Sequence, residues 1–155
     1  MNKVYLAGPF FSDHQKERLA LVKAALKKNP TIGKIFEPSE NSYTEAEFGS
    51  LEWQKATYQL DVNHIYTSDL VVAVIDYKKE EADNEPDSGT AFEIGLAYGI
   101  HKPVVVVQFD PKKELNLMIS QGLTAYFDVS KGELEDLANY DFDLFMPKLA
   151  NRPVI

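Results

Sequence analysis

Two continuous apolar runs constrain the fold of this chain more than any other feature. They cover residues 70–75 and 103–107, the second within a strand predicted at 103–109, and an unbroken apolar run is typical of a β-strand buried on both faces. Stretches with helical periodicity separate these runs from each other and from a further apolar segment at residues 3–7. Strands that alternate with helices predict a parallel sheet covered by helices on both sides, so we expect an α/β fold.

The remaining predicted elements fill the chain without an internal repeat or a low-complexity linker. Ser12 and Gln15 form a capping box at the start of one helix, and Asn29 with Pro30 ends it. We expect strands at 3–7, 34–36, 70–75, 103–109 and 124–127, and helices at 12–28, 51–66, 89–100, 115–121 and, for one turn, 132–137. Five parallel strands suggest one doubly wound, flavodoxin-like domain over residues 1–155.

Composition narrows the range of partners. The net charge of −8, with Arg18 and Arg152 as the only arginines, would repel a phosphate backbone, so we expect no nucleic-acid polymer as partner. No apolar run approaches the ~20 residues of a membrane span, and the apolar stretch within the first residues is too short for a signal peptide. We therefore expect a cytoplasmic protein that does not bind a membrane.

Several catalytic signatures are absent from the sequence. There is no cysteine, which excludes disulfides, thiolate metal sites and a cysteine nucleophile. No GxGxxG, phosphate loop or GxSxG is present, and His14, His64 and His101 form no HExxH motif, so neither a nucleotide cofactor nor a metal is predicted. The chemistry that remains available is that of aspartate and glutamate.

Ligands of doubly wound sheets bind at the carboxyl ends of the strands, where the winding direction reverses. Here that means the loops after the first and third strands. After the first strand, Gly8 lets a ligand approach the backbone closely, and Phe10 and Phe11 are able to lie over a flat ligand. The alternative is an ordinary strand-to-helix turn in which both phenylalanines belong to the core.

The loop after the third strand, residues 77–88, is rich in acidic residues and leads to two that stand out. Asp87 occupies a helix-cap position, and Glu93 falls in the first turns of the helix that follows. The spacing of Ala91, Gly95 and Gly99 predicts that this helix packs closely on the sheet and holds Glu93 near the core. Burial would raise the pKa of Glu93 and its nucleophilicity. Alternatively, it only complements the helix dipole.

Asp61 is the third candidate acid, on the helix predicted at 51–66. If Trp53, Thr57, Leu60 and His64 face the core, Asp61 flanks their stripe and reaches the site from the side. A solvated or salt-bridged aspartate is the alternative. Trp53 is able to stack on a nucleobase, although a single tryptophan is more often a packing anchor.

Four segments, taken together, resemble the nucleoside 2-deoxyribosyltransferase family. They are VYLAGPFF (4–11), WQKATYQLD (53–61), DSGTAFEIGLAYG (87–99) and NLMISQG (116–122), in the family's order and over nearly the whole chain. The resemblance implies transfer of 2-deoxyribose between purine or pyrimidine bases, from 2′-deoxynucleosides to free nucleobases, in nucleoside salvage. It implies that Glu93 attacks the anomeric carbon and forms a covalent deoxyribosyl ester, with retention of configuration.

The same resemblance implies roles for the other matched positions. Asp87 and Asp61 match two aspartates at the base, one of which protonates the departing nitrogen or hydrogen-bonds the base edge. Tyr5 matches a tyrosine that orients the nucleophile. Phe11 and Trp53 match aromatic positions that line the base pocket.

Two further positions imply an assembly. Asn116 and Met118 match residues that complete a neighbouring subunit's site near the sugar 5′-hydroxyl, so we expect a homo-oligomer, in this family typically a hexamer built as a trimer of dimers. Ser42 stands where some members carry a base-contacting glutamine, which leaves purine-only or purine-and-pyrimidine specificity open. Ile155 stands where many members end in a tyrosine close to the site.

Two other functions stay open. One is an N-glycosidase that hydrolyses 2-deoxynucleoside 5′-monophosphates with the same nucleophile; its phosphate site would be Ser12 and the adjacent helix N-terminus. The other is a nucleoside-binding domain without catalysis. The presence of Tyr5, Asp61, Asp87 and Glu93 together disfavours this last reading.

Overall fold

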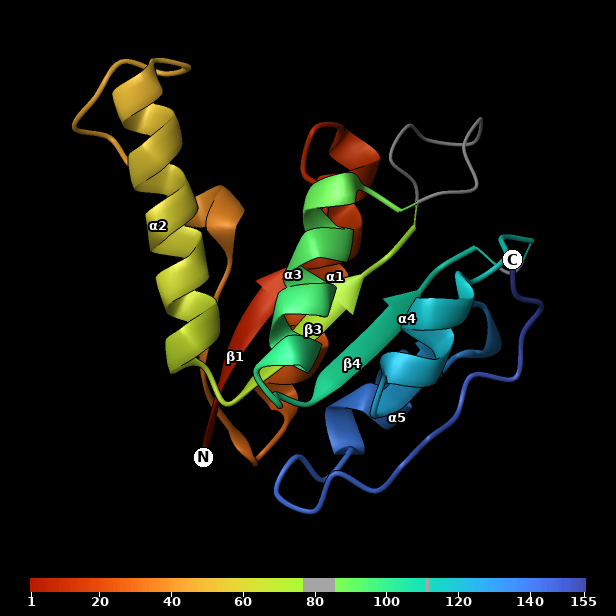
Figure 1. The fold of residues 1–155 in the computed structure, drawn as a ribbon. Helices are drawn as coiled ribbons and strands as arrows, with labels where there is room; N and C mark the ends of the chain where they lie inside the picture. Colours follow the sequence, from red (N-terminus) through yellow and green to blue (C-terminus); the bar gives the residue numbers. More distant parts are fainter. Residues whose placement is uncertain (77–85, 111) are drawn as a thin grey trace.

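The computed structural model describes residues 1–76, 86–110 and 112–155. A five-stranded parallel sheet lies at its centre (Figure 1), in the order β2-β1-β3-β4-β5. Its strands are β1 (Asn2–Ala7), β2 (Ile32–Phe36), β3 (Leu70–Val74), β4 (Val104–Gln108) and β5 (Ala125–Asp128). This is the flavodoxin-like order that the sequence predicts, with the winding reversal between β1 and β3.

Helices cover both faces of this sheet. They are α1 (Asp13–Lys28), α2 (Leu51–Thr67), α3 (Ser88–Gly99), α4 (Leu117–Gly122) and α5 (Leu134–Asn139), with 3₁₀ turns η1 (Pro38–Glu40) and η3 (Val129–Lys131). Residues of α1 and α5 share one buried cluster with one face of the strands, and residues of α2, α3 and α4 share a second cluster with the other face. No helix in the described ranges is long and apolar enough to cross a membrane.

Local sequence explains how α1 joins the sheet. Ser12 and Gln15 form the predicted capping box, in which the Ser12 side chain accepts from the main-chain N–H of Gln15. A Cβ on Gly8 would lie 2.9 Å from Cδ2 of Leu19 and 3.2 Å from Cβ of Val74. Gly8 is therefore required where α1 packs against the carboxyl ends of β1 and β3.

Two helices begin two residues later than the sequence predicts. Asn116 caps α4 by accepting from the N–H of Met118 at 2.9 Å, so the helix starts at Leu117 rather than at residue 115. Leu115 instead exchanges main-chain hydrogen bonds with Pro153 and Ile155. The turn expected at 132–137 is α5, displaced to Leu134–Asn139, because Gly132 ends η3 with a φ of 82°.

α3 packs on the sheet through a different face from the one predicted. The residues that it buries include Ile94 and Ala97. A Cβ added to Gly95 or Gly99 would meet nothing within 4 Å, and Ala91 with Gly95 lines a cavity beside α4. The prediction that Ala91, Gly95 and Gly99 form the packed face is wrong, because the helical period places that stripe away from the sheet.

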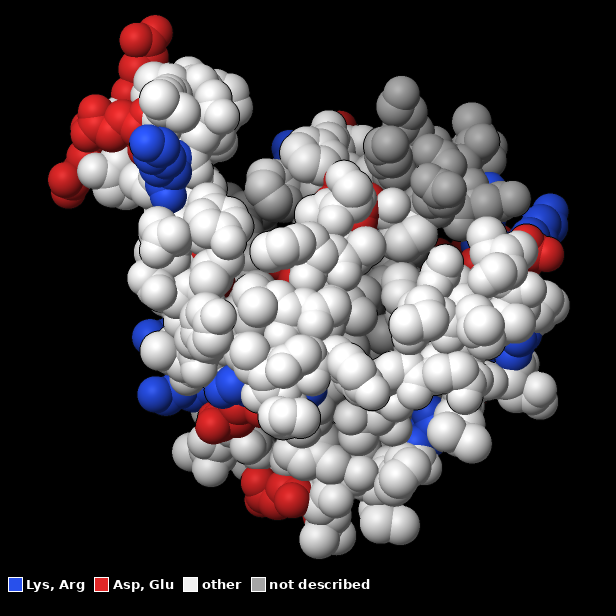
Figure 2. Space-filling model, viewed as in Figure 1, with Lys and Arg blue, Asp and Glu red and all other residues white. Residues whose placement is uncertain are grey.

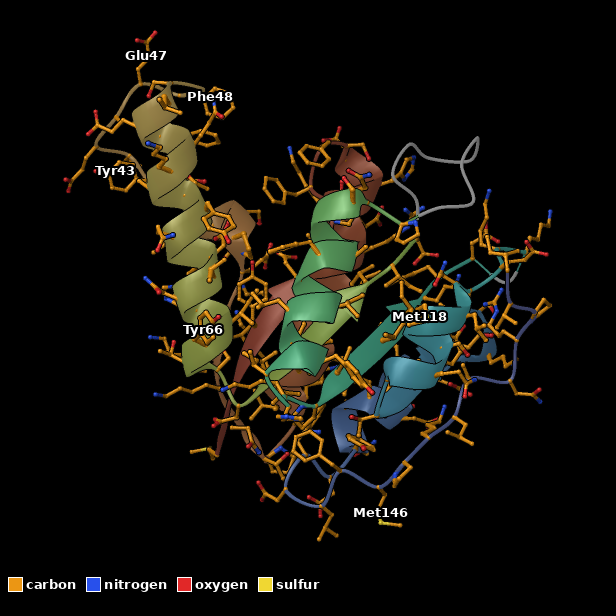
Figure 3. All side chains as sticks on the ribbon, in the orientation of Figure 1. Tyr43, Glu47, Phe48, Tyr66, Met118 and Met146 are labelled. Carbon is orange, nitrogen blue, oxygen red and sulfur yellow. The ribbon has the colours of Figure 1, made fainter. Side chains whose placement is uncertain are left out.

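Residues 41–58, the loop before α2 together with its N-terminal half, form an arm that projects from the body of the molecule (Figure 1). Tyr43, Glu47 and Phe48 lie at its tip (Figure 3). Phe48 is 82% exposed and its ring packs against Trp53, with the centroids 4.5 Å apart. Of the whole helix α2 only Ile65 is fully buried, so the expected stripe at Trp53, Thr57, Leu60 and His64 is only half-buried.

Arg152 fixes the C-terminal segment beside α4. Its guanidinium donates to the carbonyl groups of Asp110 at 2.9 Å and Lys113 at 2.8 Å, and to the Tyr126 hydroxyl at 3.1 Å. It also pairs with the buried carboxylate of Asp128 at 3.5 Å. These contacts hold the segment that approaches Asn116 against the carboxyl ends of β4 and β5.

Candidate active site

The centre of the candidate site is a hydrogen bond between Tyr5 and Glu93. Tyr5 is fully buried on β1, on the face of the sheet that α2 and α3 cover. Its hydroxyl donates to Oε1 of Glu93, which lies in the second turn of α3 and is half-buried. The fold therefore joins the two residues that the sequence proposes as nucleophile and orienting tyrosine.

Burial dominates the electrostatics of this pair. The pKa of Glu93 is raised from 4.5 to about 7, mainly by burial. The Tyr5 hydrogen bond lowers this pKa, and the negative charges of Asp61 and Asp87 raise it. Burial and the neighbouring Glu93 and Asp61 also raise the pKa of Tyr5. Tyr5 thus stays protonated and remains a hydrogen-bond donor.

Asp61 approaches the pair from α2, which packs alongside α3. Burial raises its pKa to about 6, while the charge of His64 acts in the opposite direction. Its own charge acts on both Tyr5 and Glu93. Asp61 is half-buried next to the half-buried stripe of α2, and its role at the site stays a prediction.

Asp87 is the N-cap of α3, as its position in the sequence suggests. Its Oδ2 accepts from the main-chain N–H of Thr90 at 3.0 Å. Its charge also acts on Glu93. Tyr5, Asp61, Asp87 and Glu93 thus form one acid cluster, at the sheet edge where the winding reverses.

The two phenylalanines after β1 have different environments. Phe10 packs against the core, whereas Phe11 is 72% exposed. The rings stack with centroids 5.3 Å apart, and the main-chain N–H of Phe11 donates to the Gln15 side chain at 2.7 Å. The alternative in which both phenylalanines are core residues is therefore wrong for Phe11, which offers an open aromatic face beside Gly8.

Trp53 and Ser42 belong to the arm. The Trp53 indole N–H donates to the Tyr43 carbonyl oxygen at 3.1 Å, and Ser42 is exposed. Trp53 lies eight residues before Asp61 on α2, about two helical turns away. Figure 2 shows the arm standing off from the body, with acidic atoms visible beside α3.

Asn116 and Met118 lie elsewhere. They line a cavity of about 560 Å³ between α3 and α4, together with Ala91, Gly95, Tyr98 and Ile155 among others. Met118 is 80% exposed and lies on α4, on the opposite side of α3 from α2 (Figure 3). Among the described residues, Tyr5, Asp61, Asp87 and Glu93 do not line this cavity, although Pro86 and Ser88, on either side of Asp87, do.

Two residues of this region were given no role at the site from the sequence. The rings of His64 and Phe36 stack with centroids 3.6 Å apart, and Phe36 in turn stacks on Tyr5 at 5.6 Å. The spacing of three residues between Asp61 and His64 on a predicted helix was the available signal for His64. The described parts of the chain contain no group of three His, Asp or Glu residues arranged to hold a metal ion.

A doubly wound parallel sheet with a half-buried glutamate, two aspartates and a tyrosine in one region defines an α/β protein whose candidate site is rich in carboxyl groups. The family model for nucleoside 2-deoxyribosyltransferase matches residues 4–146. A nucleoside deoxyribosyltransferase from Limosilactobacillus fermentum is 35% identical, over 91% of this chain and 86% of the relative. The chain therefore belongs to the nucleoside 2-deoxyribosyltransferase family.

Solved structures agree with this assignment. A 2-deoxyribosyltransferase from the psychrotolerant bacterium Bacillus psychrosaccharolyticus is similar with a TM-score of 0.81 and 34% identity, over 96% of this chain and 98% of the other. A CMP N-glycosidase from Clostridium botulinum shares the fold, with a TM-score of 0.57 and 18% identity over 87% of this chain and 97% of the other.

Proposed function

We propose that this chain transfers 2-deoxyribose from a 2′-deoxynucleoside to a free nucleobase, with Glu93 as nucleophile. The observation that carries the proposal is the Tyr5–Glu93 hydrogen bond inside the acid cluster. A carboxylate whose pKa is raised to about 7 by burial is more nucleophilic than a solvated one, and near neutral pH a large fraction of it is ionised.

In the first half of the reaction, a carboxylate oxygen of Glu93 forms a bond to C1′ while the bond from C1′ to the base nitrogen breaks. The electron pair of that bond leaves with the base, which takes up a proton from an aspartic acid of the cluster. The transition state is oxocarbenium-like, and the product is a deoxyribosyl ester of Glu93. The Tyr5 hydroxyl orients the attacking carboxylate.

In the second half, a nitrogen of the incoming base attacks C1′ and releases the Glu93 carboxylate. The base loses its proton to the aspartate that supplied one before. Because each half inverts C1′, the configuration is retained overall. Asp61, with a pKa raised to about 6, is suited to give and take this proton near neutral pH, and Asp87 is suited to hydrogen-bond the base edge.

The site needs a second chain to be complete. Phe11, beside Gly8, supplies an aromatic face for the base, and we assign Trp53 and Ser42 on the arm to the base pocket. Asn116 and Met118 line the opposite side of α3 within their own chain, which supports the proposal that they serve a neighbouring copy, near the sugar 5′-hydroxyl. The proposed assembly is a hexamer built from three such dimers.

The test is a chromatographic exchange assay. Purified protein receives deoxythymidine or deoxyinosine as donor, with or without adenine. We expect deoxyadenosine to form only when adenine is present. If no donor yields deoxyadenosine, the proposal is wrong.

The second candidate is hydrolysis of 2-deoxynucleoside 5′-monophosphates. Its best phosphate site, the N-terminus of α1, already has internal partners: the Gln15 side chain accepts from the N–H groups of Phe11 and Ser12, and Ser12 Oγ accepts from Gln15. This observation favours the transferase. Deoxyadenosine monophosphate as a parallel substrate separates the two, because preferential release of free adenine from it would identify the hydrolase.

A further inference from the structure

Phe36 lies directly beside the tyrosine of the candidate site. Tyr5 on β1 and Phe36 on β2 are register partners in the parallel sheet, and their rings stack with centroids 5.6 Å apart and an interplanar angle of 26°. Both residues belong to the buried cluster on the face that α2 and α3 cover. Phe36 is therefore a direct neighbour of the ring whose hydroxyl donates to Glu93.

The edge position of β2 gives Phe36 its second aromatic contact. Tyr5 lies between two register partners, Phe36 and Val71, whereas β2, the first strand of the sheet order, pairs with β1 alone among the described strands. The ring of His64 on α2 stacks on Phe36, with centroids 3.6 Å apart and an interplanar angle of 13°. Nδ1 of this imidazole is hydrogen-bonded to the Leu60 carbonyl oxygen at 2.8 Å, so the ring that contacts Phe36 is itself fixed.

The main chain at the end of β2 is held from the other face of the sheet. Glu37 follows Phe36, is buried, and pairs with Lys23 of α1 at 3.1 Å. Its carbonyl oxygen also accepts from the side-chain amide of Asn41 at 2.8 Å. The end of this edge strand is therefore anchored to α1 through Glu37 and to α2 through Phe36, which limits movement of the Phe36 ring.

The Tyr5 hydroxyl needs such support because it lies at the end of a long side chain. Catalytic groups have to be held within about 0.5 Å and 10–20° of their productive geometry by the packing of their side chains. A displacement of about 1 Å costs on the order of 10²-fold in rate. Of the two residues that flank Tyr5 in the sheet, Phe36 is the aromatic one, and its flat face is the surface against which the Tyr5 ring stacks.

We propose that Phe36 is a positioning residue for the reaction: its ring, held by His64 and by the anchored end of β2, keeps the Tyr5 ring in the orientation in which the Tyr5 hydroxyl donates to Glu93. The inference rests on the proposed function, in which Glu93 attacks C1′ and Tyr5 orients it. Phe36 is buried, so it acts on the rate through Tyr5 and not by touching the sugar or the base.

The experiment is a double-mutant cycle between Phe36 and the Tyr5 hydroxyl. The value of kcat/KM for exchange between deoxyinosine and adenine is measured for the wild type, Phe36→Leu, Tyr5→Phe and the protein that carries both changes. Tyr5→Phe keeps the ring that Phe36 contacts and removes only the oxygen through which Phe36 is proposed to act. Urea unfolding establishes that each protein is folded under the conditions of the assay.

In the wild-type background we expect Phe36→Leu to lower kcat/KM on the order of 10-fold. In the Tyr5→Phe background the same substitution should change kcat/KM by less than about twofold, because no hydroxyl remains to be positioned. Phe127→Leu is the matched control, since Phe127 is a buried phenylalanine on β5, in the cluster on the opposite face of the sheet. It should leave kcat/KM within about twofold in both backgrounds.

The same fold loss from Phe36→Leu in both backgrounds would show a general structural role and overturn the inference, and so would an unchanged rate in the wild-type background. Phe36→Met removes the ring with little change in side-chain volume, so it takes the place of Phe36→Leu, with the same outcomes, if that variant does not fold. A wild-type chain that makes no deoxyadenosine from any donor would instead refute the proposed function, so the two failures are distinguishable.

Discussion

Glu93 lies among groups that carry its own sign of charge or none. Asp61 and Asp87 raise its pKa beyond the effect of burial, and only the Tyr5 hydroxyl acts in the opposite sense. The pKa values of about 7 for Glu93 and about 6 for Asp61 leave a fraction of each carboxyl group protonated near neutral pH.

Tyr5→Phe should impair catalysis most at low pH. Loss of the hydrogen bond raises the pKa of Glu93 above about 7, so less carboxylate is present at pH 6 and the deficit shrinks toward pH 9. We expect a fall in kcat/KM on the order of 10²-fold at pH 7. The measurement is the pH profile of exchange; an equal deficit at pH 6 and pH 9 would show that the hydroxyl does not tune Glu93.

Glu93→Gln should abolish transfer and stabilise the fold at alkaline pH. The pKa of Glu93 in the folded chain, about 7, exceeds its ordinary value of 4.5, so the folded state binds more protons than the unfolded state between these values. Stability of the wild type therefore falls as pH rises through this window, by on the order of 2–3 kcal/mol. Urea unfolding of both proteins at pH 4.5 and pH 8 measures the difference, and parallel pH dependences would contradict the assignment.

At the scale of elements, α3 carries the chemistry by its position. Its cap, Asp87, and its second turn, Glu93, both face the acid cluster, whereas its outer stripe lines the cavity toward α4. α2 supplies Asp61 along one side, and the Tyr58 and Phe92 rings meet across the α2–α3 contact at 6.3 Å. The site is thus built by two helices over the strand that holds Tyr5.

Asp87→Asn isolates the chemistry of this cap from its structural role. Asparagine caps a helix as well as aspartate, so the fold should be unchanged, whereas Asp87→Ala should lose about 1 kcal/mol of stability. We expect Asp87→Asn to slow transfer most from donors whose leaving base needs protonation by the site. Rates for donors with bases of different basicity test this, and an equal loss for every base would mean that Asp87 only shapes the loop.

Much of this was predictable from the sequence, for physical reasons. Buried parallel strands leave unbroken apolar runs, and Ser12 and Asp87 cap helices through local hydrogen bonds, so order, topology and caps were predicted. The face of α3 was not, because Ala91, Gly95 and Gly99 suit close packing and an open cavity equally well. The Phe36–His64 stack joins residues far apart in the chain, and no local pattern reports such a contact. The acids at 80, 81, 83 and 85 lie outside the described residues.

At the scale of the whole molecule, α2 with Asp61 packs on one side of α3, whereas Asn116 and Met118 line the cavity on the α4 side, which reaches Pro86 and Ser88 beside Asp87. In the proposed assembly, Asn116 and Met118 of one chain complete the site that contains Glu93 of a neighbouring chain. The arm projects from the body of the molecule on the α2 side, with the exposed Phe48 at its tip (Figure 3). A closed assembly is the arrangement that satisfies both surfaces.

Subunit complementation tests this arrangement. Glu93→Ala and Asn116→Ala should each be nearly inactive alone. After the two are unfolded and refolded together, about a quarter of wild-type activity should return, because half of random pairs are mixed and each mixed pair has one intact site of two. No recovery in the mixture, with both proteins folded, would place Asn116 outside the neighbour's site.

The most direct test of the central claim is to trap the sugar on the protein. Wild-type chain is mixed with deoxyinosine without an acceptor base, quenched in acid, digested and analysed by mass spectrometry. We expect a deoxyribosyl adduct on the peptide that contains Glu93, its loss when adenine is added before the quench, and none in Glu93→Gln. Exchange that proceeds with no adduct, or with an adduct on another residue, would contradict Glu93 as the nucleophile.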